Sequence, residues 1–161
     1  MEKDGVDRIV EQWRQERPDL DTTAMEVFGR IYRLASAAAD VADEAYGRFG
    51  IARADFDVLA TLRRSGAPYE LSPSALAGWM MLSSGGTTAR LDRLEKAGLV
   101  ARRPSDTDRR GVVVRLTDKG REIVDQAVGA GLSEQQRLLR HMEPAEVKRL
   151  SELLRKALRS S

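Results

Sequence analysis

The fold is decided by residues 72–116, which read SPSALAGWMMLSSGGTTARLDRLEKAGLVARRPSDTDRRGVVVRL. Ser72 stands before a proline, and this pair marks a helix start because serine caps a helix and proline fits its first turn. After a tight turn a second helix is expected, with Ser83 or Ser84 as its cap and Gly98 as its stop. The first half of the stretch therefore predicts a helix, a turn and a helix.

The second half of the stretch predicts a β-hairpin. Residues 99–103 and 111–116 flank a segment rich in turn-forming residues, and three consecutive valines make the second run strongly β-prone. Two helices followed by a hairpin are typical of a winged helix-turn-helix. We expect the helix-turn-helix at about 72–98 and the wing at about 99–116.

Apolar residues on both sides of this stretch recur every three or four positions, as they do along one face of a helix. We expect an extension helix within residues 1–21 and a winged helix domain over 22–161. Long helices at about 23–49 and 117–159 would flank the central stretch. The fold class is therefore mainly α with a small β-hairpin wing. The last helix is expected to bury Val147, Leu150, Leu154 and Leu158.

The composition excludes several classes of function. The chain has 161 residues, 42% of them hydrophobic, with one histidine and no cysteine. This leaves no metal-ligand set, disulfide or nucleophile–histidine arrangement, so we expect no metal, no cofactor and no enzyme activity. A charged N-terminal segment and the lack of a run of about 20 apolar residues argue against a signal peptide or membrane span. A cytoplasmic protein is expected.

The charge distribution is more informative than the net charge of +2. Residues 84–116 hold eight lysines and arginines against four acidic residues. A local basic patch on a near-neutral protein fits phosphate contact through one region, although an ordinary basic surface also fits.

The expected second helix has the features needed to enter a DNA major groove. Small hydroxyl residues and glycines at its start allow close backbone approach to phosphate, and Arg90 can reach a base edge one turn later. Arginines at the hairpin tip suit the narrower minor groove. A plain cap, turn and solvated face is the alternative interpretation. The candidate DNA-binding residues are Ser72, Ser83, Ser84, Gly85, Thr87, Thr88, Arg90, Arg93, Arg109 and Arg110.

Two runs carry a resemblance to a known family. The run SSGGTTARLDRLEKAGLVARR at 83–103, followed by DTDRRGVVVRLTDKGRE at 106–122, resembles the MarR family of regulators. The resemblance implies a homodimer whose interface uses the first long helix and the two C-terminal helices. It also implies a palindromic double-stranded DNA operator, read by two recognition helices.

A narrower resemblance concerns ligand response. The segments IVEQWRQERPDLD at 9–21 and FDVLATLRRSGAPYELSPS at 56–74 resemble the PecS-type, urate-responsive branch of that family. The resemblance implies a ligand-linked set consisting of Trp13, Asp57, Arg90 and Arg102. In this set the Trp ring would stack on a flat ligand, and an arginine would donate to an anionic oxygen.

Within that set, Asp57 and Arg90 are expected to form an ion pair that links the core to the recognition helix, with Asp55 as a possible substitute for Asp57. An anionic ligand would disturb this pair and shift the recognition helix.

These inferences predict a dimeric repressor released from its operator by a small anionic effector. Urate, another purine-derived anion and an aconitate-like polycarboxylate all suit arginine contacts. The alternative is a constitutive or architectural DNA-binding protein without a small ligand. A helical protein-interaction module is a further alternative, and it predicts no salt-dependent DNA binding.

Overall fold

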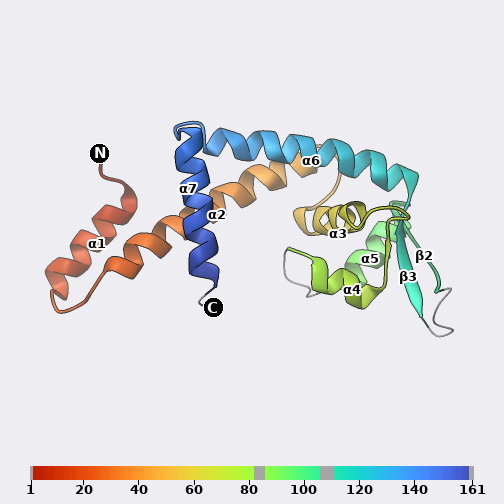
Figure 1. The fold of residues 1–161 in the computed structure, drawn as a ribbon, viewed down its shortest axis with the longest axis horizontal. Coiled ribbons are helices and arrows are strands. Elements are labelled where there is room, and N and C mark those ends of the chain that lie inside the picture. Colours follow the sequence, from red (N-terminus) through yellow and green to blue (C-terminus); the bar gives the residue numbers. More distant parts are fainter. Residues whose placement is uncertain (1, 82–85, 106–110, 160–161) are drawn as a thin grey trace. The chain divides into compact units, whose positions relative to one another are not determined.

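The computed structural model describes residues 2–81, 86–105 and 111–159. Its contacts divide the chain into two units, Met1–Asp40 and Val41–Ser161, which are described separately. The expected domain boundary near residue 21 stays a prediction. The elements, in chain order (Figure 1), are α1 (Gly5–Glu16), α2 (Thr23–Gly47), α3 (Arg53–Arg64), β1 (Glu70–Leu71), α4 (Pro73–Trp79), α5 (Thr87–Lys96), β2 (Val100–Pro104), β3 (Val112–Leu116), α6 (Asp118–Leu138) and α7 (Pro144–Leu158).

The first unit pairs α1 with the beginning of α2. The Asp4 side chain caps α1 by accepting hydrogen bonds from two backbone N–H groups of its first turn. Val6 and Val10 are each 2% exposed, and a Cβ at Gly29 of α2 would lie only 2.9 Å from Val6. Arg30 of α2 adds an ion pair to Asp4 at 2.9 Å. Residues 5–16 thus form a helix that packs against the beginning of α2.

The second unit is built around α3. Val58, Leu59 and Leu62 of this helix are fully buried, and they belong to a core cluster that also includes residues of α2, α4, α5, α6 and the sheet. At the edge of this core, the rings of Tyr46 and Phe56 stack with centroids 3.9 Å apart. A central helix packed in this way gives its polar side chains a fixed base from which to hold neighbouring elements.

The wing is a three-stranded antiparallel sheet with strand order β1-β3-β2. The sequence predicted β2 and β3, and the structure adds β1, a two-residue strand that pairs Glu70 with Arg115. Alternation along the strands sends Val100, Val114 and Leu116 into the core. The prediction of a mainly helical fold with a small β wing is confirmed. The third strand was missed because two residues are too short to show alternation.

The segment LTDKG joins the wing to α6 through tight backbone contacts. Thr117 caps α6 by accepting from Gly120 N at 3.0 Å, and its own hydroxyl donates to the Gly98 carbonyl at 2.8 Å. Lys119 donates to the Ala97 carbonyl at 3.0 Å, at the end of α5. A Cβ at Gly120 would lie 2.1 Å from the Leu99 carbonyl oxygen. These contacts therefore fix the end of α5, the expected recognition helix, against the start of α6.

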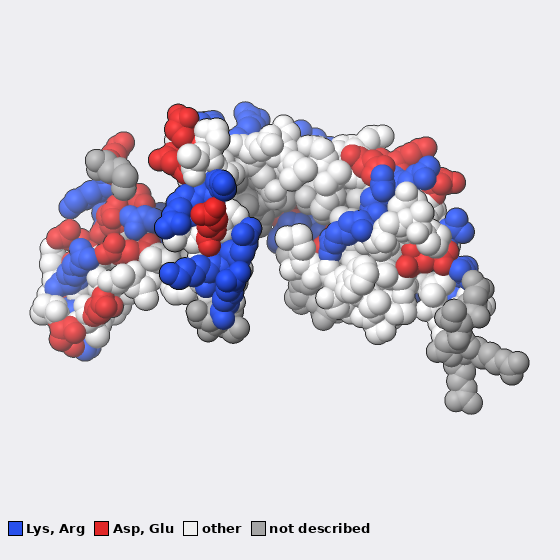
Figure 2. Space-filling view, in the orientation of Figure 1, with Lys and Arg blue, Asp and Glu red and all other residues white. Residues whose placement is uncertain are grey.

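The last helix differs from the sequence-based expectation. No residue of α7 is buried, and Leu153 and Leu158 are 47% and 73% exposed. The expectation that Val147, Leu150, Leu154 and Leu158 are buried is therefore wrong for the described single chain, in which the first three are only partly covered. Lysines and arginines gather along the surface of α7 (Figure 2). The helix thus combines a basic side with an uncovered apolar side.

Among the described residues, no helix combines the length and the apolar character needed to cross a membrane.

Candidate nucleic-acid interface

Helix α5 presents a polar face to solvent while its apolar side joins the core. Leu91 and Leu94 are each 2% exposed, whereas Thr88 is exposed and Arg90 is partly exposed. The helix begins after Gly86, whose φ of 74° lies in the left-handed region that favours glycine. The expected serine cap is therefore corrected to a glycine N-cap. The candidate contacts Ser83, Ser84 and Gly85 lie outside the described residues.

An ion pair ties α5 to the central helix α3. Arg93 Nη2 lies 2.8 Å from Asp55 Oδ1, and the Asp55 side chain is only 13% exposed. Arg93 itself is 58% exposed, so part of its guanidinium also faces solvent. Asp55, expected only as a substitute, thus links the core to the recognition helix through Arg93. The expected pair of Asp57 with Arg90 stays a prediction.

Arg102 at the base of the wing holds the other side of α5. Its guanidinium lies 2.6 Å from Asp92 and 2.9 Å from Glu95, both on α5, and its backbone N–H donates to Glu95 at 3.0 Å. The hydrogen bond to Asp92, with the charges of Asp92 and Glu95, raises the pKa of the Arg102 guanidinium above its ordinary value. Any anionic ligand at Arg102 would have to compete with these two carboxylates.

Asp57 contacts the chain where it leaves α4. The residue is 5% exposed, and its Oδ1 accepts a hydrogen bond from Met81 N at 3.2 Å. A buried carboxylate is stable only when hydrogen-bonded, so this contact accounts for part of its place in the core. From the same helix, Arg64 donates to the carbonyl oxygen of Trp79, the last residue of α4. Two side chains of α3 therefore hold the exit of α4.

The outer face of the wing carries a cluster around one carboxylate. Glu70 of β1 has a side chain only 10% exposed and accepts from Arg103 of β2 at 2.6 and 3.3 Å. Arg115 of β3 lies 3.7 Å from the same carboxylate. Glu70 thus joins all three strands and fixes two wing arginines. The tip candidates Arg109 and Arg110 lie outside the described residues.

The remaining predicted residues are placed as follows. Ser72 acts as the N-cap of α4, accepting from Ala75 N at 3.2 Å, and Thr87 opens α5. Trp13 belongs to the first unit, on α1, and is 44% exposed. Asp57, Arg90 and Arg102 therefore belong to the second unit, whereas Trp13 belongs to the first.

Four of these contact residues were missed by sequence reasoning: Glu70, Arg64, Asp92 and Glu95. A partial signal exists for the last two, because acids three residues apart share one helix face and can meet a single arginine. Glu70 and Arg64 left no such signal, because their partners lie 33 and 15 residues away along the chain.

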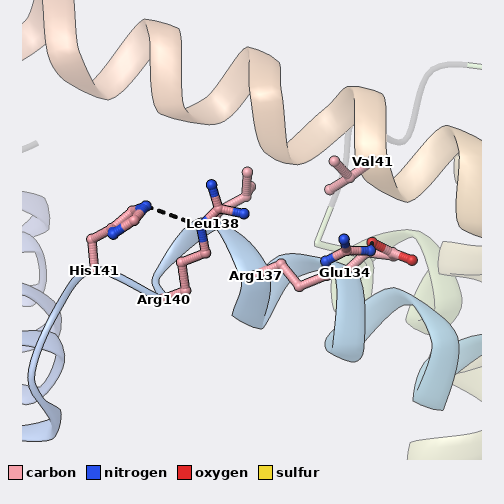
Figure 3. Close-up of a pocket in the computed structure, with 6 residues that line it drawn as sticks. All are labelled: Val41, Glu134, Arg137, Leu138, Arg140 and His141. Atoms are coloured by element: carbon pink, nitrogen blue, oxygen red, sulfur yellow. Dashed lines mark hydrogen bonds and ion pairs between the residues drawn. The ribbon is translucent and has the colours of Figure 1, made fainter.

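A separate pocket of about 340 Å³ lies between α2 and the end of α6. Figure 3 shows Arg140 and His141 in contact near its wall, and Arg140 Nε donates to His141 Nε2 at 2.9 Å. Arg137 lies 3.1 Å from Glu134, which also lies 3.7 Å from Arg48. The charged side chains that line this pocket thus largely contact one another. Among the described residues, no group of three His, Cys, Asp or Glu side chains is placed to hold a metal ion.

Comparison with known proteins identifies the family. A profile described as "MarR family" matches residues 49–111. The HTH-type transcriptional regulator PecS of Dickeya dadantii is 39% identical over 92% of this chain and 90% of its own length. The multiple antibiotic resistance protein MarR of Escherichia coli is 33% identical over 81% of this chain and 90% of its own length.

Solved structures agree with these sequence matches. A single-residue variant of Escherichia coli MarR complexed with operator DNA has a TM-score of 0.73 at 28% identity, covering 91% of this chain and 97% of that one. BpsR of Bordetella bronchiseptica, described with a mechanism for regulation of its DNA binding by 6-hydroxynicotinic acid, has a TM-score of 0.71 at 25% identity, covering 81% and 91%. With α4, α5 and the wing in this arrangement, the chain belongs to the MarR family of winged helix-turn-helix, DNA-binding transcriptional regulators, which are not enzymes.

Proposed function

We propose that the protein is a homodimeric repressor that binds a palindromic operator and is released from it by a small anionic ligand. The observation that carries this proposal is that ion pairs bind α5 on two sides. Its Arg93 is bound to Asp55 of α3, and its Asp92 and Glu95 are bound to Arg102 of the wing. Because ion pairs hold the recognition helix on both sides, a competing anion can change its position.

DNA contact is proposed through the start and exposed face of α5 together with the wing tip. The Escherichia coli relative was solved on operator DNA, which supports the same use of the corresponding elements here. Ser72 would act mainly by capping α4, because its hydroxyl already serves that helix. The proposed contacts are Ser83, Ser84, Gly85, Thr87, Thr88, Arg90, Arg93, Arg109 and Arg110.

Replacing Arg90 with alanine is expected to weaken binding to the DNA upstream of the protein's own gene by about tenfold, the cost of one lost base or phosphate contact. If the contact is to phosphate, the slope of log K against log salt should also fall by about 0.9. Fluorescence anisotropy at several salt concentrations measures both quantities. Lys96→Ala removes the same charge from the last turn of α5 and serves as the control. Equal effects of the two substitutions would contradict a specific role for Arg90.

For ligand response, we propose that an anion competes with Asp92 and Glu95 for Arg102. Their release would leave two uncompensated carboxylates on the recognition helix, which disfavours DNA. The BpsR relative, whose DNA binding is described as regulated by 6-hydroxynicotinic acid, supports an anionic aromatic effector. Trp13, Asp57 and Arg90 complete the proposed ligand-linked set, with urate, another purine-derived anion or an aconitate-like polycarboxylate as the effector.

Two variants test the ligand proposal. Trp13→Ala is expected to leave DNA affinity unchanged and to raise the urate or aconitate concentration needed for half-release by about tenfold, the effect of one lost stacking partner. Arg102→Gln should lower DNA affinity as well as ligand response, because it also removes the hold on α5. Titration of the preformed protein–DNA complex gives both numbers. If no anion releases the DNA at any concentration, a constitutive or architectural regulator is favoured instead.

A further inference from the structure

The end of α4 is followed by residues that are only partly packed. The side chains of Trp79 and Met81 are 54% and 86% exposed, so neither is anchored in the core. Met80 between them packs partly against the core and adopts an extended conformation with φ −66° and ψ 145°, which ends the helix. In addition, the backbone of residues 79–81 forms two hydrogen bonds with side chains of another helix.

Two polar side chains of α3 supply those interactions. Asp57 accepts from Met81 N at 3.2 Å, and Arg64 donates to the Trp79 carbonyl oxygen. The Trp79 carbonyl is among the C=O groups that a helix end leaves without an intrahelical partner, and the Met81 N–H follows the C-cap Met80. Asp57 and Arg64 are seven residues apart, or about two helical turns, so they project from the same side of α3.

The base of this hold is rigid. Val58, Leu59 and Leu62 lie between Asp57 and Arg64 and are fully buried, which fixes the position of α3 in the core. The same helix binds α5 through the pair of Asp55 with Arg93 at 2.8 Å. One buried helix therefore contacts both the end of α4 and the body of α5.

We propose that Asp57 and Arg64 are positioning residues that set the placement of α4 relative to α5, and thereby the fit of the helix-turn-helix to its operator. The contact made by Asp57 needs a hydrogen-bond acceptor at Oδ1 and does not need a negative charge. The contact made by Arg64 needs a donor that reaches the Trp79 carbonyl. Neither residue has to touch DNA for this role.

The experiment compares removal of each group with its conservative replacement. The specific probe is a duplex selected by the wild-type protein from a random library, and the non-specific probe is a random-sequence duplex. Asp57→Ala and Arg64→Ala are expected to weaken binding to the selected duplex by about tenfold, the effect of losing one anchoring hydrogen bond. Binding to the random duplex should change by less than about twofold, because phosphate attraction does not require an exact fit.

Arg64→Lys is expected to retain selective binding, because an ammonium group can also donate to the Trp79 carbonyl oxygen. A second readout is amide hydrogen exchange, which should become faster at Met81 in Asp57→Ala and stay slow in Asp57→Asn. Arg63→Ala is the matched control, since it removes a neighbouring arginine that binds Asp125 of α6 instead.

Clear results would overturn the proposal. If Arg64→Lys loses selectivity as fully as Arg64→Ala, or if exchange at Met81 is as fast in Asp57→Asn as in Asp57→Ala, these hydrogen bonds are not what positions the end of α4. If both alanine variants are folded and bind the selected duplex as the wild type does, the hold on residues 79–81 is not needed. Should Asp57→Ala fail to fold, Arg64→Ala and Arg64→Lys still decide the question.

Discussion

Leu154→Glu is expected to turn the proposed dimer into a monomer and to weaken operator binding by about a hundredfold, the loss expected when two linked half-site contacts become independent. Leu154 lies on the apolar side of α7 and is only partly covered, in a helix with no buried residue. Leu158, one turn further, is 73% exposed. A second copy of the chain would cover this side, and a glutamate placed there would be a buried, unpaired charge.

The control for this variant uses the opposite side of the same helix. Lys156→Gln changes the net charge by the same amount as Leu154→Glu, and it should leave mass and DNA affinity unchanged. Sedimentation equilibrium gives the mass, and circular dichroism checks that the monomer remains folded. A Leu154→Glu protein that is still dimeric and binds its operator normally would show that this side of α7 does not carry the interface.

Gly120→Ala is expected to lower the free energy of unfolding by about 3 kcal/mol, a typical cost of forcing an atom into a packed site. Its Cβ would lie 2.1 Å from the Leu99 carbonyl oxygen and 2.9 Å from Leu116 Cδ1. The first of these neighbours is backbone and cannot rotate away. The expected sign is notable because alanine in place of a helical glycine ordinarily stabilises a protein by up to about 1 kcal/mol.

Gly129→Ala tests that sign within the same helix. A Cβ at Gly129 meets no atom within 4 Å in the single chain, so this substitution is expected to stabilise α6 slightly. Urea unfolding followed by circular dichroism gives both free energies. Equal changes in the two variants would mean that α6 moves away from Leu99 at little cost. In that case the contact would not fix α5 relative to α6.

Much of the fold could be predicted from the sequence because its signals are local. Apolar residues that recur every three or four positions predicted the extension helix and the long helices on both sides of the central stretch. Turn residues between two β-prone runs predicted the hairpin. Each of these features depends on residues within one or two helical turns of each other. Where the structure differed, the signal was short or absent, as for the two-residue strand β1 and the cap at Gly86.

The candidate site divides in the same way. Arg90 was placed on the recognition helix by sequence spacing, and Arg102 entered through the family resemblance. The partners of Arg102 were not evident, because the sequence cannot show which acids meet an arginine across a turn between helix and strand. Asp57 was expected to pair with an arginine, whereas the structure adds a contact with the Met81 N–H. That contact bridges 24 residues of chain.

The sequence by itself determined the type of protein: a winged helix-turn-helix between long helices, with a local basic patch and no set of catalytic groups. These properties follow from periodicity, turn chemistry and composition, which act over short distances along the chain. Only the tertiary structure decided that Arg93 binds Asp55, that Arg102 binds Asp92 and Glu95, and that α7 keeps its apolar side uncovered. Such contacts depend on which elements pack together, and packing is settled by the whole core rather than by neighbouring residues.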